Sequence, residues 1–227
     1  DAPGQTPSAA PCAPLGDSVI TGKVLFKGQA PAPAALRLDN EPACKAHHST
    51  GLTSETLVVN PGGTLRHVVV SITKGLEDRT FAPPAEPVTL DQKGCQYIPH
   101  VFGIQVGQPV RLVNSDSVLH NVHARPANGK AFNVGMPGRS RPWSLEKSFT
   151  AAEIVPIRCD VHPWMVSWAA VSDHPFFSVT GKDGAFALRG LPAGEYTVRA
   201  WHETLGTRTQ KVSVGAHASK SLTFSFQ

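Results

Sequence analysis

The amino-acid sequence predicts an all-β protein, and three observations support that prediction. Gly and Pro each occur 20 times among 227 residues, which is a turn-rich composition. Val, Thr and Phe recur in short runs between these breakers, as is typical of many short strands. No segment of useful length shows the 3.6-residue periodicity of an amphipathic helix. With 41% hydrophobic residues, a packed core is expected, and the length suggests about two domains.

Apolar or alternating runs of strand length can be placed along most of the chain. We predict strands at 20–26, 57–60, 66–72, 88–90, 102–106, 109–114, 143–149, 154–159 and 166–171, with repeated strand–turn–strand units over 176–226. Residues 124–141 are rich in Gly and Pro and are predicted to form a long loop.

The charge balance excludes some classes of partner. The formal net charge is +4, and no cluster of Lys and Arg is dense enough to predict nucleic-acid binding. A weak preference for acidic partners is compatible with this charge. No apolar run approaches the roughly 18 residues of a membrane helix, so no transmembrane segment is expected.

The beginning of the chain and the cysteines bear on its compartment. Residues 1–16 are rich in Pro, Ala and Ser and predict a disordered tether, either of an exported protein after signal removal or of an arbitrarily cut chain. If Cys159 is a metal ligand, one disulfide at most can form among Cys12, Cys44 and Cys95. We favour Cys44 with Cys95, which would fit a periplasmic or secreted protein.

Four residues from two separated stretches form the candidate metal site. Cys159, His162 and Met165 follow each other at three-residue spacing, and His120 comes after the predicted strand that ends at Asn114. A soft thiolate, two imidazoles and a weak thioether form the ligand set of a blue-copper centre, so one copper per chain is predicted. Zinc would prefer a further Cys or His to Met. A nucleophilic Cys–His pair is the other alternative, and spacing by itself does not decide among the three.

A wider pattern around these residues resembles the cupredoxins, the small blue copper proteins. It covers about residues 88–172, and the loop between Cys159 and Met165 is similar in length and kind to that of amicyanin. The other matching residues are Val106, Gly107, Val110, Asn114, His120, Asn121 and Val122. The resemblance implies a Greek-key β-sandwich, copper held by His120, Cys159, His162 and Met165, and single-electron transfer. It also implies that Asn121 braces the copper loop.

The loop departs from the family pattern at its second and third positions. Asp160 and Val161 stand where Thr or Ser and Pro are usual. The Val161 amide could donate to the Cys159 sulfur and raise the reduction potential, whereas the carboxylate of Asp160 would lower it. Arg158 replaces an aromatic residue.

A second pattern resembles the carboxypeptidase-regulatory-like or collagen-adhesin-B-like sandwich, which is an Ig-like or transthyretin-like fold. The matching segments are residues 20–24, 178–186 and 191–198. Since they lie on both sides of the cupredoxin pattern, we predict a discontinuous Ig-like unit at 17–87 and 174–227 with the copper domain, 88–173, inserted in it. Consecutive units are the alternative.

Several other residues could contribute to metal binding. His123 is expected to point away from the metal, and Met136 would compete as axial ligand from within a poorly ordered loop. His174, His202 and Glu203 could form a second metal site, although ordinary hydrogen bonding is the simpler expectation.

The function expected from these patterns is an exported electron carrier for a redox partner such as a cytochrome, an oxidase or a dehydrogenase. It would dock through Pro163 and Trp164 and transfer electrons at an exposed edge of His162. The alternative is a non-redox binding or adhesion module with a copper-sensing or copper-storage site. We do not expect an enzyme, because the paired His-x-His motifs of multicopper oxidases and nitrite reductases do not occur.

Overall fold

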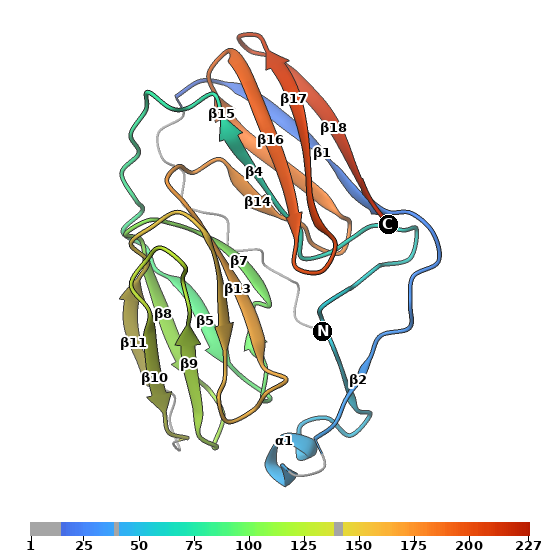
Figure 1. Cartoon of the computed structure of the whole chain (residues 1–227), viewed down its shortest axis with the longest axis vertical. Coiled ribbons are helices and arrows are strands. Elements are labelled where there is room, and N and C mark those ends of the chain that lie inside the picture. Colours follow the sequence, from blue (N-terminus) through green and yellow to red (C-terminus); the bar gives the residue numbers. More distant parts are fainter. Residues whose placement is uncertain (1–14, 39–40, 139–142) are drawn as a thin grey trace. The chain divides into compact units, whose positions relative to one another are not determined.

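The computed structural model, shown in Figure 1, describes residues 15–38, 41–138 and 143–227. Strands make up nearly all of its regular structure, which confirms the all-β prediction. The short helix α1 (Pro42–Ala46) was not predicted, because five residues are too few to display a helical period. The chain divides into a flanking unit, 1–32, 56–82 and 174–227, and an inserted unit, 33–55 and 83–173.

The flanking unit is a sandwich of two sheets around one core. The sheets have the strand orders β15-β1-β18 and β14-β4-β16-β17. Val24 of β1 and Val198 of β16 are fully buried in the same hydrophobic cluster, although 173 residues separate them by number. The strands are β1 (Ser18–Phe26), β4 (Val69–Lys74), β14 (Phe177–Val179), β15 (Ala185–Leu191), β16 (Gly194–His202), β17 (Gly206–Val214) and β18 (Ser219–Phe226).

The inserted unit has its own core between a five-stranded sheet, β10-β9-β12-β13-β7, and a four-stranded sheet, β11-β8-β5-β6. A two-stranded sheet joins β2 (Ala35–Leu36) and β3 (Leu52–Thr53). The remaining strands are β5 (Val88–Gln92), β6 (Tyr97–Ile98), β7 (Val101–Gln105), β8 (Pro109–Asn114), β9 (His120–Ala124), β10 (Phe132–Met136), β11 (Trp143–Ser148), β12 (Ile154–Arg158) and β13 (Val166–Ser172).

The predicted loop at 124–141 is wrong in part, because it contains β10. Strand β10 pairs antiparallel with β9, and Met136 lies opposite His120. The alternation of Phe132, Val134 and Met136 was a strand signal that the Gly and Pro content of the surrounding residues obscured. Residues 139–142 of that loop lie outside the described residues.

Two other strand predictions, both in the flanking unit, differ from the observed structure. Residues 57–60 form a single bridge, from Val59 to Leu65, in place of a strand. The strand predicted from residue 66 begins at Val69, because His67 has a backbone φ of 63° and breaks the extended run.

The unit boundaries also differ from those predicted, since residues 33–55 and 83–87 group with the inserted unit. A disulfide between Cys44 and Cys95, the pair favoured from the sequence, ties this segment to the unit across a separation of 51 residues. The rest of the predicted tether and Cys12 lie outside the described residues, but Gly16 is ordered and donates its N–H to Gly190 O at 3.1 Å. Among the described residues, no helix is long and apolar enough to cross a membrane.

Close approach of strands in the flanking unit requires a glycine at position 22, and this gives a test. A Cβ added to Gly22 would lie 1.9 Å from Leu222 O and 2.7 Å from the Phe186 ring. We expect Gly22→Ala to lower the free energy of unfolding of this unit by about 2 kcal/mol or more, as overpacking does. Urea denaturation followed by circular dichroism measures it. Gly181→Ala is the control, because the nearest atom to its added Cβ is 4.0 Å away; equal effects of the two changes would contradict the argument.

Candidate metal centre

Strand pairing brings His120 and Cys159 together at one edge of the five-stranded sheet. His120 opens β9, and Cys159 follows the last residue of β12. These strands are antiparallel neighbours with Arg158 opposite His123. Continuing that register carries Cys159 alongside the beginning of β9, so two residues 39 positions apart meet because two strands pair.

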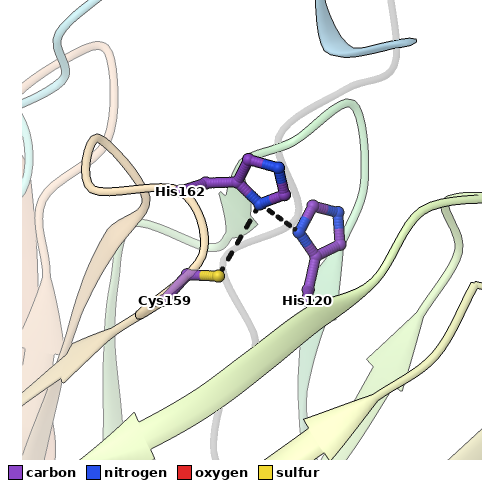
Figure 2. A group of neighbouring side chains, drawn as sticks. All are labelled: His120, Cys159 and His162. Atoms are coloured by element: carbon purple, nitrogen blue, oxygen red, sulfur yellow. Dashed lines mark hydrogen bonds between the residues drawn. The ribbon is translucent and has the colours of Figure 1, made fainter. Parts of the chain in front are cut away.

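Figure 2 shows the two imidazoles and the sulfur directed toward one another. Nδ1 of His120 lies 2.9 Å from Nδ1 of His162, and Nδ1 of His162 lies 3.7 Å from Sγ of Cys159. All three residues are buried, and one donor atom from each lies within 4.8 Å of the other two. These are three of the four residues that the sequence predicted to be ligands.

The donor set fits a single soft transition-metal ion. Such an ion takes imidazole nitrogen at about 2.0 Å and thiolate sulfur at about 2.3 Å, so donors about 3–4 Å apart can share it. The two imidazole nitrogens lie at hydrogen-bonding distance from each other beside the thiol, and all three residues are buried. The chemistry of nitrogen, nitrogen and sulfur favours copper or zinc over a hard cation.

The loop after Cys159 is closed by its own backbone. Cys159 N donates to Met165 O at 3.2 Å, and Met165 N donates to His162 O at 2.9 Å. These bonds fold the loop so that His162 returns toward the sulfur. Met165 is buried in the core of the inserted unit. Its role as the fourth ligand stays a prediction.

A carboxylate that the sequence did not reveal contacts His120 at Nε2, the ring nitrogen that faces away from His162. Oδ2 of Asp116 lies 2.9 Å from Nε2 of His120. Gly94 N and Cys95 N each donate to this carboxylate at 2.7 Å. Both of these residues have positive φ, 61° and 54°, so their N–H groups converge on one anion, as in a backbone nest. The bond to Asp116 fixes a proton on Nε2 and leaves Nδ1 free to bind a metal.

The charged states of this pair follow from its contacts. Burial by itself would raise the pKa of Asp116, but His120, Cys95 N and Gly94 N together hold that pKa below its usual value. Burial would lower the pKa of His120, and the contacts with Asp116 and Cys159 more than offset it, so the pKa is raised. For His162, burial and the neighbouring His120 lower the pKa, which favours the neutral form that binds metals.

The sulfur of Cys159 is held in an environment that favours the thiolate. Burial would raise its pKa, but contacts with His120 and with the backbone of Asn121, His162 and Val161 lower it below the usual value. Oδ1 of Asn121 lies 3.3 Å from the sulfur and also accepts from Asp160 N at 2.7 Å. Asn121 therefore braces the ligand loop, in the position expected for it.

The structure places His162 differently from the sequence-based expectation. Only 1% of His162 is exposed, so no ring edge reaches the surface. Its Nε2 lies 3.9 Å from Oε2 of Glu41, in the segment that the disulfide attaches to the inserted unit. The Trp164 ring packs against His162 with centroids 5.2 Å apart, and Trp164 Nε1 donates to Cys95 O. The prediction of an exposed His162 edge was wrong, because residues 33–55 return to this site and no sequence pattern indicates that return.

The other candidate residues do not join the cluster. Met136 is held on strand β10, where its sulfur accepts from Gln92 Nε2 at 2.9 Å. A second geometric grouping, Cys95 with Asp116 and His120, fails as a metal site because the Cys95 sulfur is in the disulfide. His174 bonds Ile72 O, and His202 Nδ1 accepts from backbone N–H groups; neither belongs to a metal-ligand grouping among the described residues.

His123 lies on the other side of β9 from His120, as predicted. Its Nδ1 is 3.0 Å from both carboxylate oxygens of Asp160, and Arg125 Nε donates to its Nε2 at 3.2 Å. The Asp160 carboxylate also accepts from Asn121 and Asn133 at 2.9 Å. The contact with His123, followed by those with the two amides, keeps the pKa of Asp160 below its ordinary value.

Comparison with known proteins gives partial structural likenesses. No family model matches, and no curated protein matches. A purple cupredoxin from Nitrosopumilus maritimus matches with 28% identity over 37% of this chain and 99% of its own, at a TM-score of 0.31. A copper-containing nitrite reductase from Thermus scotoductus SA-01 matches with 22% identity over 45% of this chain and 27% of its own, at 0.34. A reduced Cu(I) form of an amicyanin variant matches with 23% identity over 45% of this chain and 98% of its own, at a TM-score of 0.33. The Ig-like resemblance of the flanking unit stays a prediction.

The ion pair of Asp116 and His120 predicts a pH optimum for the stability of the copper-free protein. An unfolded Asp titrates near about 3.9 and an unfolded His near about 6.5. Asp116, whose folded pKa is lowered, contributes stability above about pH 4 that is lost as pH falls through its folded pKa. His120, whose folded pKa is raised, contributes stability below about pH 6.5 that is lost as pH rises through its folded pKa.

Both contributions are therefore complete between about pH 4 and pH 6.5. In this window we expect Asp116→Asn to lower the free energy of unfolding by about 2 kcal/mol or more, and by less on either side. Urea denaturation at several pH values measures this difference. Asp91→Asn is the control. Burial raises the pKa of Asp91, so ionisation of this carboxyl does not stabilise the folded protein, and its replacement should not show the same loss in this window. A loss for Asp116→Asn that does not vary with pH would show that the ion pair is not its cause.

Proposed function

We propose that the inserted unit binds one copper ion through His120, Cys159 and His162, with Met165 as a weak fourth ligand, and carries single electrons between redox partners. The observation that carries this proposal is the convergence of Nδ1 of His120, Sγ of Cys159 and Nδ1 of His162 in a buried cluster. Bound copper would supply one-electron exchange between Cu(I) and Cu(II), and a soft thiolate with two imidazoles suits both states.

The chain's own residues contribute rigidity and exclusion of water. Asp116 orients His120, Asn121 braces Cys159 and Asp160, and backbone bonds close the loop from Cys159 to Met165. Ligands held in this way need not rearrange when the charge of the site changes. Burial keeps water and other ligands away from the donors.

The expected setting is an oxidising compartment outside the cytoplasm, and the partner would be a redox protein such as a cytochrome, an oxidase or a dehydrogenase. The disulfide between Cys44 and Cys95 supports this setting, because structural disulfides persist where the medium is oxidising. We propose a carrier without enzymatic activity of its own. The buried position of both imidazoles and of the thiol supports this proposal.

The same burial favours a second candidate, a copper-storage or copper-sensing module without a redox role. A shielded His162 would slow electron exchange through its ring while still holding a metal. Electron self-exchange measured by NMR line broadening in mixtures of Cu(I) and Cu(II) protein separates the two candidates. Exchange too slow to detect, or a site that holds Cu(I) and rejects Cu(II), favours storage.

The optical spectrum tests the copper site. We expect the protein with Cu(II) to take up one copper per chain and to show an intense thiolate-to-copper absorption band. Cys159→Ser removes the thiolate, so it should abolish the band. Met165→Ala should shift the band without abolishing it, because the axial ligand tunes the site. Absorption and electron paramagnetic resonance spectra provide these measurements.

Met136→Ala is the matched control, because its sulfur is engaged by Gln92 in the native protein. We expect its band to stay at the native position. A colourless Cu(II) protein would contradict the proposal, and more than one copper per chain would point to an additional site.

A further inference from the structure

The burial of His162 raises the question of where electrons leave this site. The Nε2 edge of His162 faces Glu41 and does not reach solvent. Electronic coupling weakens steeply with distance and is carried better through covalent and hydrogen bonds than through gaps. A short bonded route from a different donor to exposed atoms would therefore replace the ring edge.

Such a route begins at Cys159. The next residue in the chain, Asp160, is covalently attached to the sulfur ligand, and its carboxylate contacts His123 Nδ1 at 3.0 Å. From the sulfur to the His123 ring, the route crosses one hydrogen bond and no gap. Each side chain on this route is partly exposed, since 43% of Asp160, 24% of His123 and 57% of Arg125 are accessible.

The surface at the end of this route is positively charged. His123 and Arg158 are cross-strand neighbours of β9 and β12, so their side chains share the outer face of the sheet. Arg125 lies on the same face, two residues beyond His123, and donates to that ring. Arg125 lies 3.5 Å from the Asp160 carboxylate, so two guanidinium groups and one carboxylate share this face. Val161, the residue after Asp160 in the ligand loop, has an exposed apolar side chain.

We propose that the surface formed by His123, Arg125, Arg158 and Asp160 is the electron port of this protein, and that it docks redox proteins with an acidic surface. The inference rests on the proposed copper function. Each transfer moves one electron between the copper–thiolate site and the redox centre of the partner, with no bond broken and no proton moved. The acidic partner follows from charge complementarity, which governs docking rates more than affinity.

The docking surface can be located without copper. Hexacyanochromate(III), a paramagnetic and redox-inert trianion, serves as the probe because its negative charge imitates the acidic groups of a partner protein. Added to the ¹⁵N-labelled copper-free full chain, it should broaden the amide signals of His123, Arg125 and Arg158 first. Broadening centred on His162 and on Leu119, the exposed residue before the ligand His120, or spread evenly over the chain, would overturn the proposed surface. This measurement stands even if the site binds no copper.

Electron transfer tests the port in the copper-loaded protein. Ferricyanide accepts one electron from the Cu(I) protein and becomes ferrocyanide, and stopped-flow absorption records the rate. We expect the double variant Arg125→Gln, Arg158→Gln to react about threefold to tenfold more slowly at low salt, with a weaker dependence on ionic strength. Oxidation by the cation tris(phenanthroline)cobalt(III) should be no slower than in the native protein.

The matched control is Arg111→Gln, Lys147→Gln, which removes the same charge from exposed positions on the other sheet. We expect a native ferricyanide rate in this control, and an equal slowing of both double variants would overturn the port. Glu41→Gln separates the two routes, because a rise in rate with both probes would assign the exit to His162. Absence of the thiolate-to-copper band would instead count against the copper function itself.

Discussion

The pairing of β9 with β12 is the constraint on which the candidate metal centre depends. It holds His120 beside Cys159, and backbone hydrogen bonds within the loop from Cys159 to Met165 return His162 to the same point. Both strands belong to the sheet that covers the core of the inserted unit. Backbone hydrogen bonds and packing therefore hold the three donors at one point.

Polar groups around the ligands extend this rigidity. Asp116 receives two backbone N–H groups from the turn at Gly94 and Cys95, and it holds His120 from the side opposite the donor atom. The same turn carries the disulfide to Cys44 and accepts a hydrogen bond from Trp164. One short turn thus connects both imidazole ligands to the segment at 33–55. A change at this turn would disturb both ligands together.

The Nε2 edge of His162 is buried, whereas Asp160, in the same loop, is exposed to solvent. The two sides of the ligand loop therefore differ in their access to a partner. Glu41 faces the Nε2 edge of His162, whereas Asp160 leads from the thiolate toward His123 and solvent. The outward route is lined with groups that hydrogen-bond to one another, so their positions are defined in the absence of a partner. Positive charge at its end gives an approaching acidic protein a preferred orientation.

The sequence by itself determined the all-β class and most strands, because strand periodicity is a local signal. It also predicted the three residues of the donor cluster and favoured Cys44 with Cys95 as the disulfide pair. It did not reveal Asp116, Glu41 or the route through Asp160, and it misplaced the exposed edge of His162. Those features depend on a bend, a returning segment and a pairing register that bring distant residues together. Such contacts are set by which backbone elements close on one another, and only the tertiary structure decided them.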